Sequence, residues 1–346
     1  MSLNRIVNAA ISATTQSSLW PGQATVLDDS QMSDLSKKLL PVFNEVVVQE
    51  KLGKNILPYL SSLYLPLAAW LADKHSHKPA CTPIVVGING AQGAGKSTLC
   101  KILKALLIHG FGKSVVHLSI DDLYLSRQRR EALAQVIHPL FKVRGVPGTH
   151  DVELGKKILT SLTQGAEELP IKLPVFDKAR DDLLPDSEWL LVDEPVDVIL
   201  FEGWCVGSRA QADEDLNNSV NDLEQSEDEH AVWRKYVNAQ LEGPYQALFG
   251  FIDCLVMMKV PDMDSVFEWR NLQERKLRQR CQDAGKPHSK VTTKKSKKVM
   301  SEAEVVRFIQ HFERITRENL REMPGRSDIL LELNKQHQVS GVRVTS

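Results

Sequence analysis

The sequence predicts an α/β fold in which helices cover both faces of a mainly parallel sheet. Four short, apolar stretches rich in β-branched residues predict strands: "PIVVGI", "SVVHLSI", "VDVILFEG" and "IDCLVMMKV". Helical segments lie between the first two strands and elsewhere, and strands buried on both faces have this continuous apolar composition. Ligands of such sheets bind at the carboxyl ends of the strands. We therefore expect the functional residues of this chain at those ends.

The chain divides into a helical start and a longer α/β region. Within residues 1–80, "LSKKLLPVFNEVV" and "YLSSLYLPLAAWLADK" carry apolar residues at helical spacing. The segment "HSHKPACTP" then breaks this pattern, so residues 81–346 are expected to form the second unit. Two charged segments interrupt it. The acidic segment 211–230 predicts a solvated, partly disordered insertion, and the six lysines of 286–298 predict either a surface loop or a mobile cationic flap.

Composition excludes several classes of protein. The net charge of 346 residues is −1, which shows no overall balance for binding nucleic acid. The five cysteines are widely spaced and form no CxxC pair, as is typical of a reducing compartment, so we expect a cytoplasmic protein. No apolar run reaches the length of a membrane span. The oligomeric state is left open.

A glycine-rich segment after the first strand carries the most specific motif. "GAQGAGKS", Gly90 to Ser97, fits G-x-x-x-x-G-K-[ST] and precedes a predicted helix that we expect Gly110 to end. Successive N–H groups of such a loop bind phosphate, and the helix N-terminus adds partial positive charge. The sequence therefore predicts a P-loop NTPase-type three-layer fold that binds ATP. The nucleotide-binding residues would be Gly90, Ala91, Gln92, Gly93, Ala94, Gly95, Lys96, Ser97 and Thr98.

Two of these side chains have individual roles. Lys96 is expected to reach the β- and γ-phosphates and to act in catalysis, and the Ser97 hydroxyl is expected to bind Mg²⁺. Glu202, at the end of the apolar strand "VDVILFEG", is the second expected Mg²⁺ ligand, because a carboxylate at the mouth of a buried strand requires a cation or a donor. The alternative for Glu202 is a solvent-exposed position at the sheet edge.

The pair Asp121 and Asp122 ends the strand that follows the P-loop helix. A small-molecule kinase needs a carboxylate that orients and deprotonates an acceptor hydroxyl, and Asp121 is our predicted general base. A nucleotide-dependent switch needs mainly a metal-associated carboxylate and a positioned water. A third possibility is that the two acids only cap a turn or helix.

Other stretches supply candidates for the acceptor site. "VRGVPGTHD" and "LPVFDKARDD" combine cations, tight turns and acids, and an anionic acceptor would require Arg144 or Lys178. The helix "FEWRNLQERKLRQR" begins a cationic region, about 268–300, that could close as a lid over the phosphates. The alternative for each charge is an ordinary solvated position. The candidates are Tyr124, Arg144, His150, Asp151, Asp177, Lys178 and Arg270.

Together these motifs resemble the P-loop kinases grouped with phosphoribulokinase, uridine kinase and bacterial pantothenate kinase. Within that group the chain is similar to the plant and fungal-type D-glycerate 3-kinase family, on "GAQGAGKST", "SIDDLYL", "RGVPGTHD", "LPVFDKARDD", "ILFEGWCVG" and "WRNLQERKLR". Leu123 stands where the wider group usually has Phe. The resemblance implies phosphorylation of D-glycerate, a small hydroxy acid, at its 3-hydroxyl by ATP with Mg²⁺, and Asp121 as the base. A pantothenate- or uridine-like acceptor, or a nucleotide-dependent switch, is the alternative.

Overall fold

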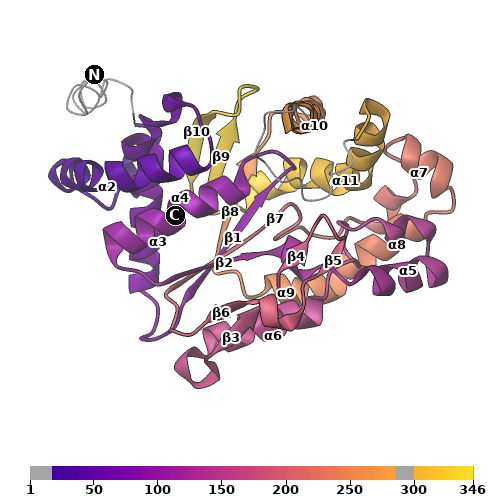
Figure 1. Ribbon diagram of the computed structural model, residues 1–346, viewed down its shortest axis with the longest axis horizontal. Coiled ribbons are helices and arrows are strands. Elements are labelled where there is room, and N and C mark those ends of the chain that lie inside the picture. Colours follow the sequence, from indigo (N-terminus) through magenta and orange to yellow (C-terminus); the bar gives the residue numbers. More distant parts are fainter. Residues whose placement is uncertain (1–17, 285–299, 346) are drawn as a thin grey trace.

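A six-stranded sheet forms the centre of the computed structural model, which describes residues 18–284 and 300–345 (Figure 1). Its strand order is β10-β9-β8-β1-β7-β2. Neighbouring strands are parallel except at the β9–β10 hairpin, where the strands are antiparallel. The strands are β1 (Ile84–Gly90), β2 (Val115–Ser119), β7 (Val198–Gly203), β8 (Cys254–Lys259), β9 (Ile329–Leu333) and β10 (Val339–Val344). The four predicted strands are confirmed, whereas β9 and β10 were missed.

Helices cover both faces of this sheet, as predicted. Val86 and Ile88 of β1 share a hydrophobic core with α2 (Asp29–Gln49), α3 (Leu65–Ser76) and α4 (Lys96–Phe111). Val85 of β1 and Phe201 of β7 face the other core, which contains α6 (Val152–Thr163) and α9 (Gln246–Phe249). Because successive side chains of a strand point to opposite faces, each central strand contributes to both cores.

The N-terminal extension is helical over its described part and packs directly on the α/β core. Asp28 begins α2 with a capping box, in which its side chain accepts from the Gln31 N–H and the Gln31 side chain accepts from the Asp28 N–H. Leu39 and Phe43 of α2 and Leu63 before α3 are buried in the core that also holds α4 and β1. The extension therefore adds a layer of helices over one face of the sheet.

The expected end of α4 at Gly110 was wrong. The helix continues to Phe111, and Gly112 ends it in the left-handed conformation, with φ of 63°. Gly110 stays in the helix beside α2, where a Cβ would come 2.9 Å from Leu39 Cδ1. Helices commonly end with a left-handed glycine, so the second of the two glycines stops the helix and the first allows close packing.

The acidic segment 211–230 was expected to be solvated and partly disordered; most of its residues are exposed, but the expected disorder was wrong. It contains a short turn, Asp213–Leu216, and the helix α7 (Asp222–Glu227), which leads to α8 (Val232–Gln240). Leu216, Leu223, Glu224 and Asp228 are all buried. Its acids include carboxylates that pair with buried arginines from other elements, and composition alone does not show such long-range pairing.

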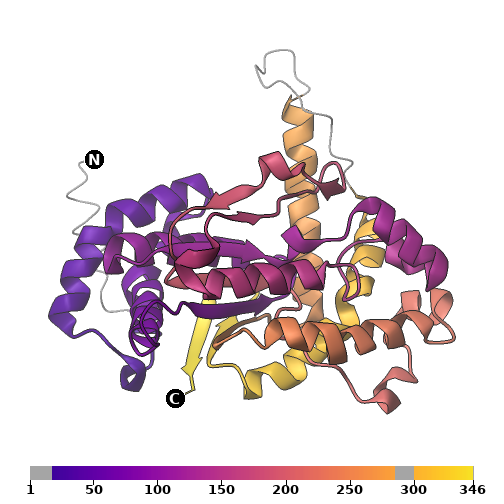
Figure 2. The ribbon, with the colours of Figure 1, turned by 90° about the horizontal axis from the view of Figure 1, so that it is seen from below.

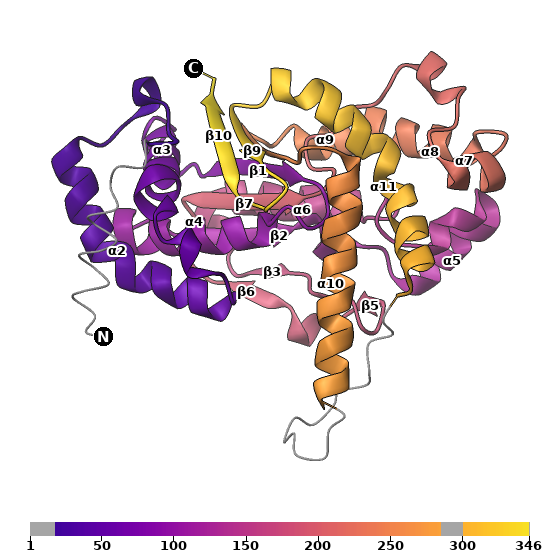
Figure 3. The same cartoon turned by 90° about the horizontal axis from the view of Figure 1, so that it is seen from above.

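Two long helices complete the fold. α10 (Met263–Ala284) follows β8, and its C-terminal end projects away from the body of the molecule. α11 (Glu302–Glu322) lies on the body (Figures 2 and 3). The lysine-rich segment 286–298 lies outside the described residues, so the expected lid is described only over α10 and from residue 300. The smaller elements are α5 (Arg127–Val136), the pair β3 (Ile171–Leu173) and β6 (Leu190–Val192), and the hairpin of β4 (Phe176–Asp177) and β5 (Asp182–Leu183). Within the described ranges, no helix is both long and apolar enough to cross a membrane.

Candidate functional site

The loop Gly90–Ser97 joins β1 to α4 and has the backbone of an anion-binding loop. Gly93 and Gly95 have positive φ angles of 85° and 96°, which glycine adopts without steric cost. At Gly90 a Cβ would lie 3.0 Å from Met258 Cβ, so a side chain would force the loop away from β8. Ala91 and Ala94 are buried in the core beneath the loop. Strand, loop and helix therefore stand in the arrangement that exposes backbone N–H groups to a phosphate.

The polar side chains of the loop point along it and toward β7. Lys96 Nζ donates to the backbone carbonyls of Gly90 at 2.8 Å and Ala91 at 3.2 Å, so the ammonium lies across the loop. Ser97 Oγ donates to Glu202 Oε1 at 2.8 Å. Gln92 Oε1 is buried without a hydrogen-bond partner. A cation and a hydroxyl–carboxylate pair thus flank the glycine-rich backbone.

A cavity of about 540 Å³ opens beside this loop. One wall is aromatic, because the rings of Trp269 in α10 and His337 in the β9–β10 turn lie 3.8 Å apart. The N-terminal extension supplies another wall. Lining residues include Gly53, Asn55, Tyr59 and Tyr64 of the extension, Gly93, Ser97 and Thr98 of the loop, and Gln273 of α10. The cavity therefore joins the phosphate-binding loop to an aromatic surface built from three distant parts of the chain.

Strand order brings the predicted acids together. β7 lies between β1 and β2, and Glu202 of β7 is in register with both Ile88 of β1 and Ser119 of β2. Glu202 is only 5% exposed, and His117 Nε2 lies 3.7 Å from its Oε1 atom. Burial would raise the pKa of Glu202, but His117, Lys96 and the Ser97 hydroxyl outweigh it and hold that pKa below its usual range. The carboxylate is therefore ionised at neutral pH.

Ser97 and Glu202 offer the chemistry that Mg²⁺ requires. Mg²⁺ is a hard cation that prefers oxygen ligands, and beside a nucleotide it needs only one or two carboxylates besides phosphate oxygens and water. Over the parts of the chain that the structure describes, no three His, Cys, Asp or Glu side chains gather as a metal cluster of their own. An ionised carboxylate bonded to a P-loop hydroxyl fits a nucleotide-bound Mg²⁺.

Asp121 and Asp122 lie just beyond β2, in the short turn Ile120–Leu123, and have different partners. Asp121 Oδ2 lies 2.5 Å from Lys178 Nζ, and its Oδ1 accepts from the Tyr124 hydroxyl at 2.7 Å. Burial would raise the pKa of Asp121, but the Lys178 ammonium and the hydrogen bond from Tyr124 lower it below the usual value. Asp122 instead accepts from the Phe176 N–H at 3.2 Å, and burial raises its pKa. Asp121 is therefore the ionised, partly exposed carboxylate, and Asp122 anchors β4.

Tyr124 and His150 lie behind Asp121. Their rings stack at 4.7 Å, and both side chains are buried. His150 Nδ1 is 2.6 Å from the Tyr245 hydroxyl, which also accepts from the Gly148 N–H. Burial lowers the pKa of His150 to about 4, so the ring is neutral at physiological pH. Tyr124 therefore supports Asp121 directly and His150 supports it through Tyr124, and their contact with a substrate stays a prediction.

Asp151 and Arg270 have clear partners of their own. Asp151 accepts from the Leu154 N–H at the start of α6 and pairs with Arg129, so it acts as a helix N-cap. Arg270 pairs with Glu274 at 2.6 Å along α10, and its guanidinium lies 5.0 Å from the Phe308 ring centroid. Neither side chain contacts Asp121 in this arrangement.

The β4–β5 hairpin and the segment around Arg144 form a cationic cluster next to Asp121. The Arg144 guanidinium lies over the rings of Phe176 and Tyr124, at 5.4 and 5.9 Å, and pairs with Asp181. The other Asp181 oxygen lies 2.8 Å from Nη2 of Arg130, which is 1% exposed. Two guanidinium groups therefore share one carboxylate, and this trio carries one net positive charge.

Sequence reasoning missed Arg130 and Asp181. Arg130 lies in the charged run "SRQRRE", where nothing distinguishes a buried arginine from its solvated neighbours. Asp177, which was predicted, shapes the hairpin turn, because its Oδ1 accepts from the N–H groups of Ala179 and Arg180. The only sequence signal for Asp181 is the pair of aspartates in "ARDD". This pair does not indicate which arginine Asp181 contacts.

Comparisons with known proteins agree with this geometry, although no protein-family model matches the chain. The chain is 31% identical over 243 residues to an uncharacterized kinase, mug58, of Schizosaccharomyces pombe, across 68% of this chain and 80% of the relative. It is also 31% identical over 230 residues to the chloroplastic D-glycerate 3-kinase of Arabidopsis thaliana. The chain belongs to the D-glycerate 3-kinase-like family of P-loop kinases. Members of this family are related to the pantothenate kinases, to which the chain also shows similarity.

The extent of these matches differs. The alignment with the plant enzyme covers 62% of this chain, which spans about half (48%) of that enzyme's length. Among solved structures, a D-glycerate 3-kinase from Cryptococcus neoformans matches with a TM-score of 0.65 over 81% of this chain and 97% of that one. At 23% identity this likeness shows the fold. As a D-glycerate 3-kinase-like protein, the chain is an ATP-dependent kinase.

Proposed function

We propose that this kinase transfers the γ-phosphoryl group of ATP to the 3-hydroxyl of D-glycerate. The observation that carries the proposal is the cationic trio of Arg130, Arg144 and Asp181 beside Asp121. Its net positive charge suits an acceptor with one carboxylate, and arginine–carboxylate contacts are among the strong hydrogen bonds of proteins. Arg144 also lies over Tyr124, whose hydroxyl binds Asp121, so the anion site and the base belong to one connected cluster.

The names of two similar proteins support this acceptor. The plant relative and the fungal structure are both described as D-glycerate 3-kinases. D-Glycerate has one carboxylate for Arg144 and a primary hydroxyl for Asp121. A neutral nucleoside such as uridine would leave the positive charge of the trio without a partner. Charge complementarity therefore favours an acidic acceptor over a uridine-like one.

The reaction follows from the chemistry of the side chains. The acceptor oxygen forms a bond to the γ-phosphorus, the bond from that phosphorus to the bridging oxygen breaks, and ADP leaves with the electron pair. Asp121 orients the acceptor hydroxyl and takes its proton, and its low pKa suits a transition state in which that proton moves late. Lys96 stabilises the negative charge that develops between the β- and γ-phosphates. Mg²⁺ held by Ser97 and Glu202 would supply charge neutralisation at the phosphates.

We further propose that the base of ATP lies in the 540 Å³ cavity next to the P-loop. The cavity begins at Gly93–Ser97, where the phosphates would lie, and extends to the Trp269–His337 wall. Aromatic rings provide a stacking surface for a purine. This position leaves the other side of the loop, near Asp121, for the acceptor.

The compartment is part of the same proposal. Among the cysteines whose side chains the structure describes, four are free thiols: Cys81, Cys100, Cys205 and Cys254. Free thiols are typical of a reducing environment, which supports the cytoplasm.

An acceptor panel tests the proposed function. ADP formation from ATP and Mg²⁺ is measured with D-glycerate, pantothenate, uridine or no acceptor, and phosphorus NMR identifies the product. We expect D-glycerate to give the fastest turnover and a phosphate ester at its primary hydroxyl. Turnover with pantothenate or uridine alone would reject D-glycerate as the substrate. Slow ATP hydrolysis whose rate is the same with and without each acceptor would instead support a nucleotide-dependent switch.

A further inference from the structure

The acidic segment 211–230 is bound to α11 by a buried ion-pair network that we call the acidic clamp, composed of Gln211, Asp215, Asn218, Glu224 and Arg314. Glu224 is fully buried and Arg314 is 7% exposed. Their carboxylate and guanidinium form two parallel hydrogen bonds, from Nε to Oε1 at 2.8 Å and from Nη2 to Oε2 at 2.6 Å. Removing one partner of such a buried pair leaves an uncompensated charge, so the geometry is strongly constrained.

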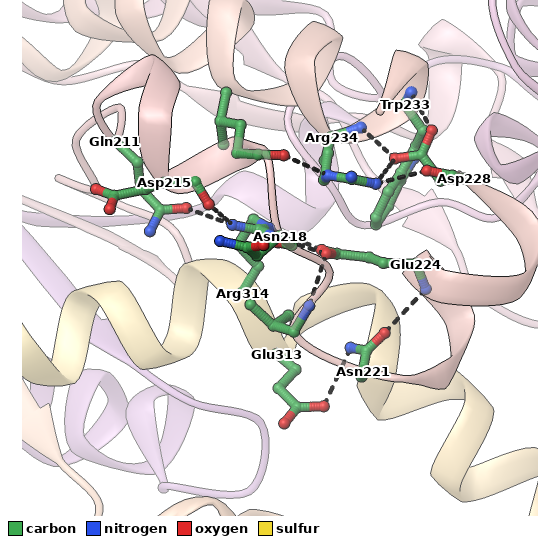
Figure 4. Close-up of polar contacts among 12 residues, drawn as sticks. Gln211, Asp215, Asn218, Asn221, Glu224, Asp228, Trp233, Arg234, Glu313 and Arg314 are labelled. Carbon is green, nitrogen blue, oxygen red and sulfur yellow. Dashed lines mark hydrogen bonds and ion pairs between the residues drawn. The ribbon is translucent and has the colours of Figure 1, made fainter. Parts of the chain in front are cut away.

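All five guanidinium donors of Arg314 are used (Figure 4). Besides Glu224, they bind the Asp215 carbonyl at 3.0 Å, the Asn218 carbonyl at 2.5 Å and Gln211 Oε1 at 3.3 Å. A planar guanidinium with five fixed donors specifies the position of every acceptor around it. Arg314 therefore fixes the fold of the acidic segment relative to α11.

Further contacts fall on the same face of α11 as Arg314. Asn221 Nδ2 donates to the Gln310 carbonyl at 2.9 Å, and Glu227 pairs with Arg307 at the exposed rim. Positions 307, 310 and 314 are three or four residues apart and share one face of a helix. The acidic segment thus covers one face of α11 over nearly two turns.

The opposite face of α11 contacts the candidate acceptor site. The Phe312 ring meets Trp204 edge to face at 4.9 Å, and a Cβ at Gly145 would lie 2.4 Å from Phe312 Cε1. Trp204 Nε1 donates to the Gly145 carbonyl at 2.9 Å. Gly145 adjoins Arg144, and Trp204 follows Glu202 by two residues. Phe312 therefore supports both the segment that carries the anion-binding arginine and the strand end that carries the expected metal ligand.

We propose that the acidic clamp is a positioning element of the acceptor site, which acts on Arg144 through the contact of Phe312 with Gly145 and Trp204. The proposal rests on Arg144 as the acceptor-binding cation of the proposed function. α11 lies between the clamp and the 144–149 segment, so loss of the clamp lets the helix shift and displaces that segment. Neither Arg314 nor Phe312 makes a hydrogen bond or ring contact with the P-loop among the described residues. Glu202 is also held separately by Ser97 and His117, so nucleotide binding should change less than acceptor binding.

Two measurements on the full-length chain test this proposal: amide hydrogen exchange and steady-state kinetics with D-glycerate and ATP. The variants are Glu224→Gln and Arg314→Lys in the clamp, and Phe312→Leu on the opposite face. We expect faster exchange at 143–150, where Gly145, Gly148 and Thr149 amides are hydrogen-bonded, and unchanged exchange at 90–99. The D-glycerate KM should rise about 10- to 100-fold, the cost of misplacing a positioning group by about 1 Å, with a clearly smaller change in the ATP KM.

The matched control is Glu227→Gln, which removes an exposed ion pair between the same two elements and should change neither readout. Faster exchange confined to 211–230, or spread over the whole chain, would show that the clamp only stabilises the fold and would overturn the proposal. Arg314→Lys keeps the charge and decides the question if Glu224→Gln does not fold. If the parent chain does not phosphorylate D-glycerate, the proposed function fails, and exchange at 143–150 alone still decides whether the clamp positions this segment.

Discussion

Lys178 Nζ lies 2.5 Å from Asp121 Oδ2, so the candidate base is paired with a cation from the turn of the β4–β5 hairpin. Lys178 is 55% exposed and Asp121 29% exposed at the side chain, which leaves the pair accessible from solvent. Burial alone would raise the pKa of Asp121, and Lys178 is the main group that lowers it. The lysine therefore controls the pH range over which the base is ionised.

Replacing Lys178 by Met should move the acidic limb of the pH–rate profile to higher pH. Without the ammonium, burial raises the pKa of Asp121, so the carboxylate takes up a proton at a higher pH and activity is lost sooner on acidification. Lys178→Arg keeps the charge and is the control that should preserve the limb. An unchanged limb together with a raised D-glycerate KM would make Lys178 an acceptor-binding residue only.

Asp121→Asn should lower kcat by about 10²- to 10⁴-fold, the usual contribution of a general base. Asparagine keeps the shape and can still hydrogen-bond the hydroxyl, but it cannot accept the proton. The ATP KM should change little. Asp122→Asn is the comparison and should be milder, because Asp122 holds the Phe176 N–H. A larger loss for Asp122 would assign the base to the neighbouring carboxylate, and a large loss of ATP–Mg²⁺ affinity in Asp121→Asn would indicate a metal ligand.

Lys96→Ala should reduce the rate of phosphoryl transfer by about 10²-fold or more, as for other losses of a preorganised electrostatic stabiliser. Single-turnover measurement of ADP formation isolates this step from product release. Lys101→Ala removes another lysine of the same helix, one that is half-exposed and pairs with Glu50, and should leave the rate near that of the parent. Equal rates for parent and Lys96→Ala would contradict the P-loop role.

Arg144→Met should raise the D-glycerate KM about 10- to 100-fold, since a hydrogen bond to a charged group contributes ~1.5–3 kcal/mol. The ATP KM should stay the same, because Arg144 lies on the Asp121 side of the loop with Tyr124 and Phe176. Arg180→Met, in the hairpin turn and 65% exposed, is the matched control. An effect on ATP alone would remove the support for an acidic acceptor.

His337→Asn should raise the ATP KM by about tenfold and leave the D-glycerate KM unchanged, since stacking of a nucleobase on an aromatic ring contributes ~1–3 kcal/mol. His337 is the exposed ring of the wall, whereas Trp269 is buried in the core and its truncation would disturb the fold. Trp269 and His337 form the aromatic wall of the cavity beside the P-loop. Steady-state kinetics with each substrate varied in turn separates the two effects. A change in the D-glycerate KM alone would place the acceptor, and not the nucleobase of ATP, in this cavity.

The sequence by itself determined the parts of the site whose chemistry comes from contiguous residues. The P-loop is complete within Gly90–Ser97. Gly93 and Gly95 are required by the local backbone conformation, whereas Gly90 is required by the close approach of Met258 in β8. Buried strands are apolar over their whole length, so acids at their ends, such as Asp121 and Glu202, stand out. The parallel sheet and the meeting of these acids at one edge followed from the same pattern.

Only the tertiary structure decided which charges pair and which segments meet. Arg130 meets Asp181 from 51 positions away, and Arg314 meets Glu224 from 90 positions away. A run of charged residues has the same composition whether it is solvated or paired, so segment 211–230 predicted partial disorder and yet folds on α11. The cavity beside the P-loop likewise needs the N-terminal extension, α10 and the β9–β10 turn at once. The free energy of these contacts comes from burial and long-range pairing, and the local sequence does not encode the partner.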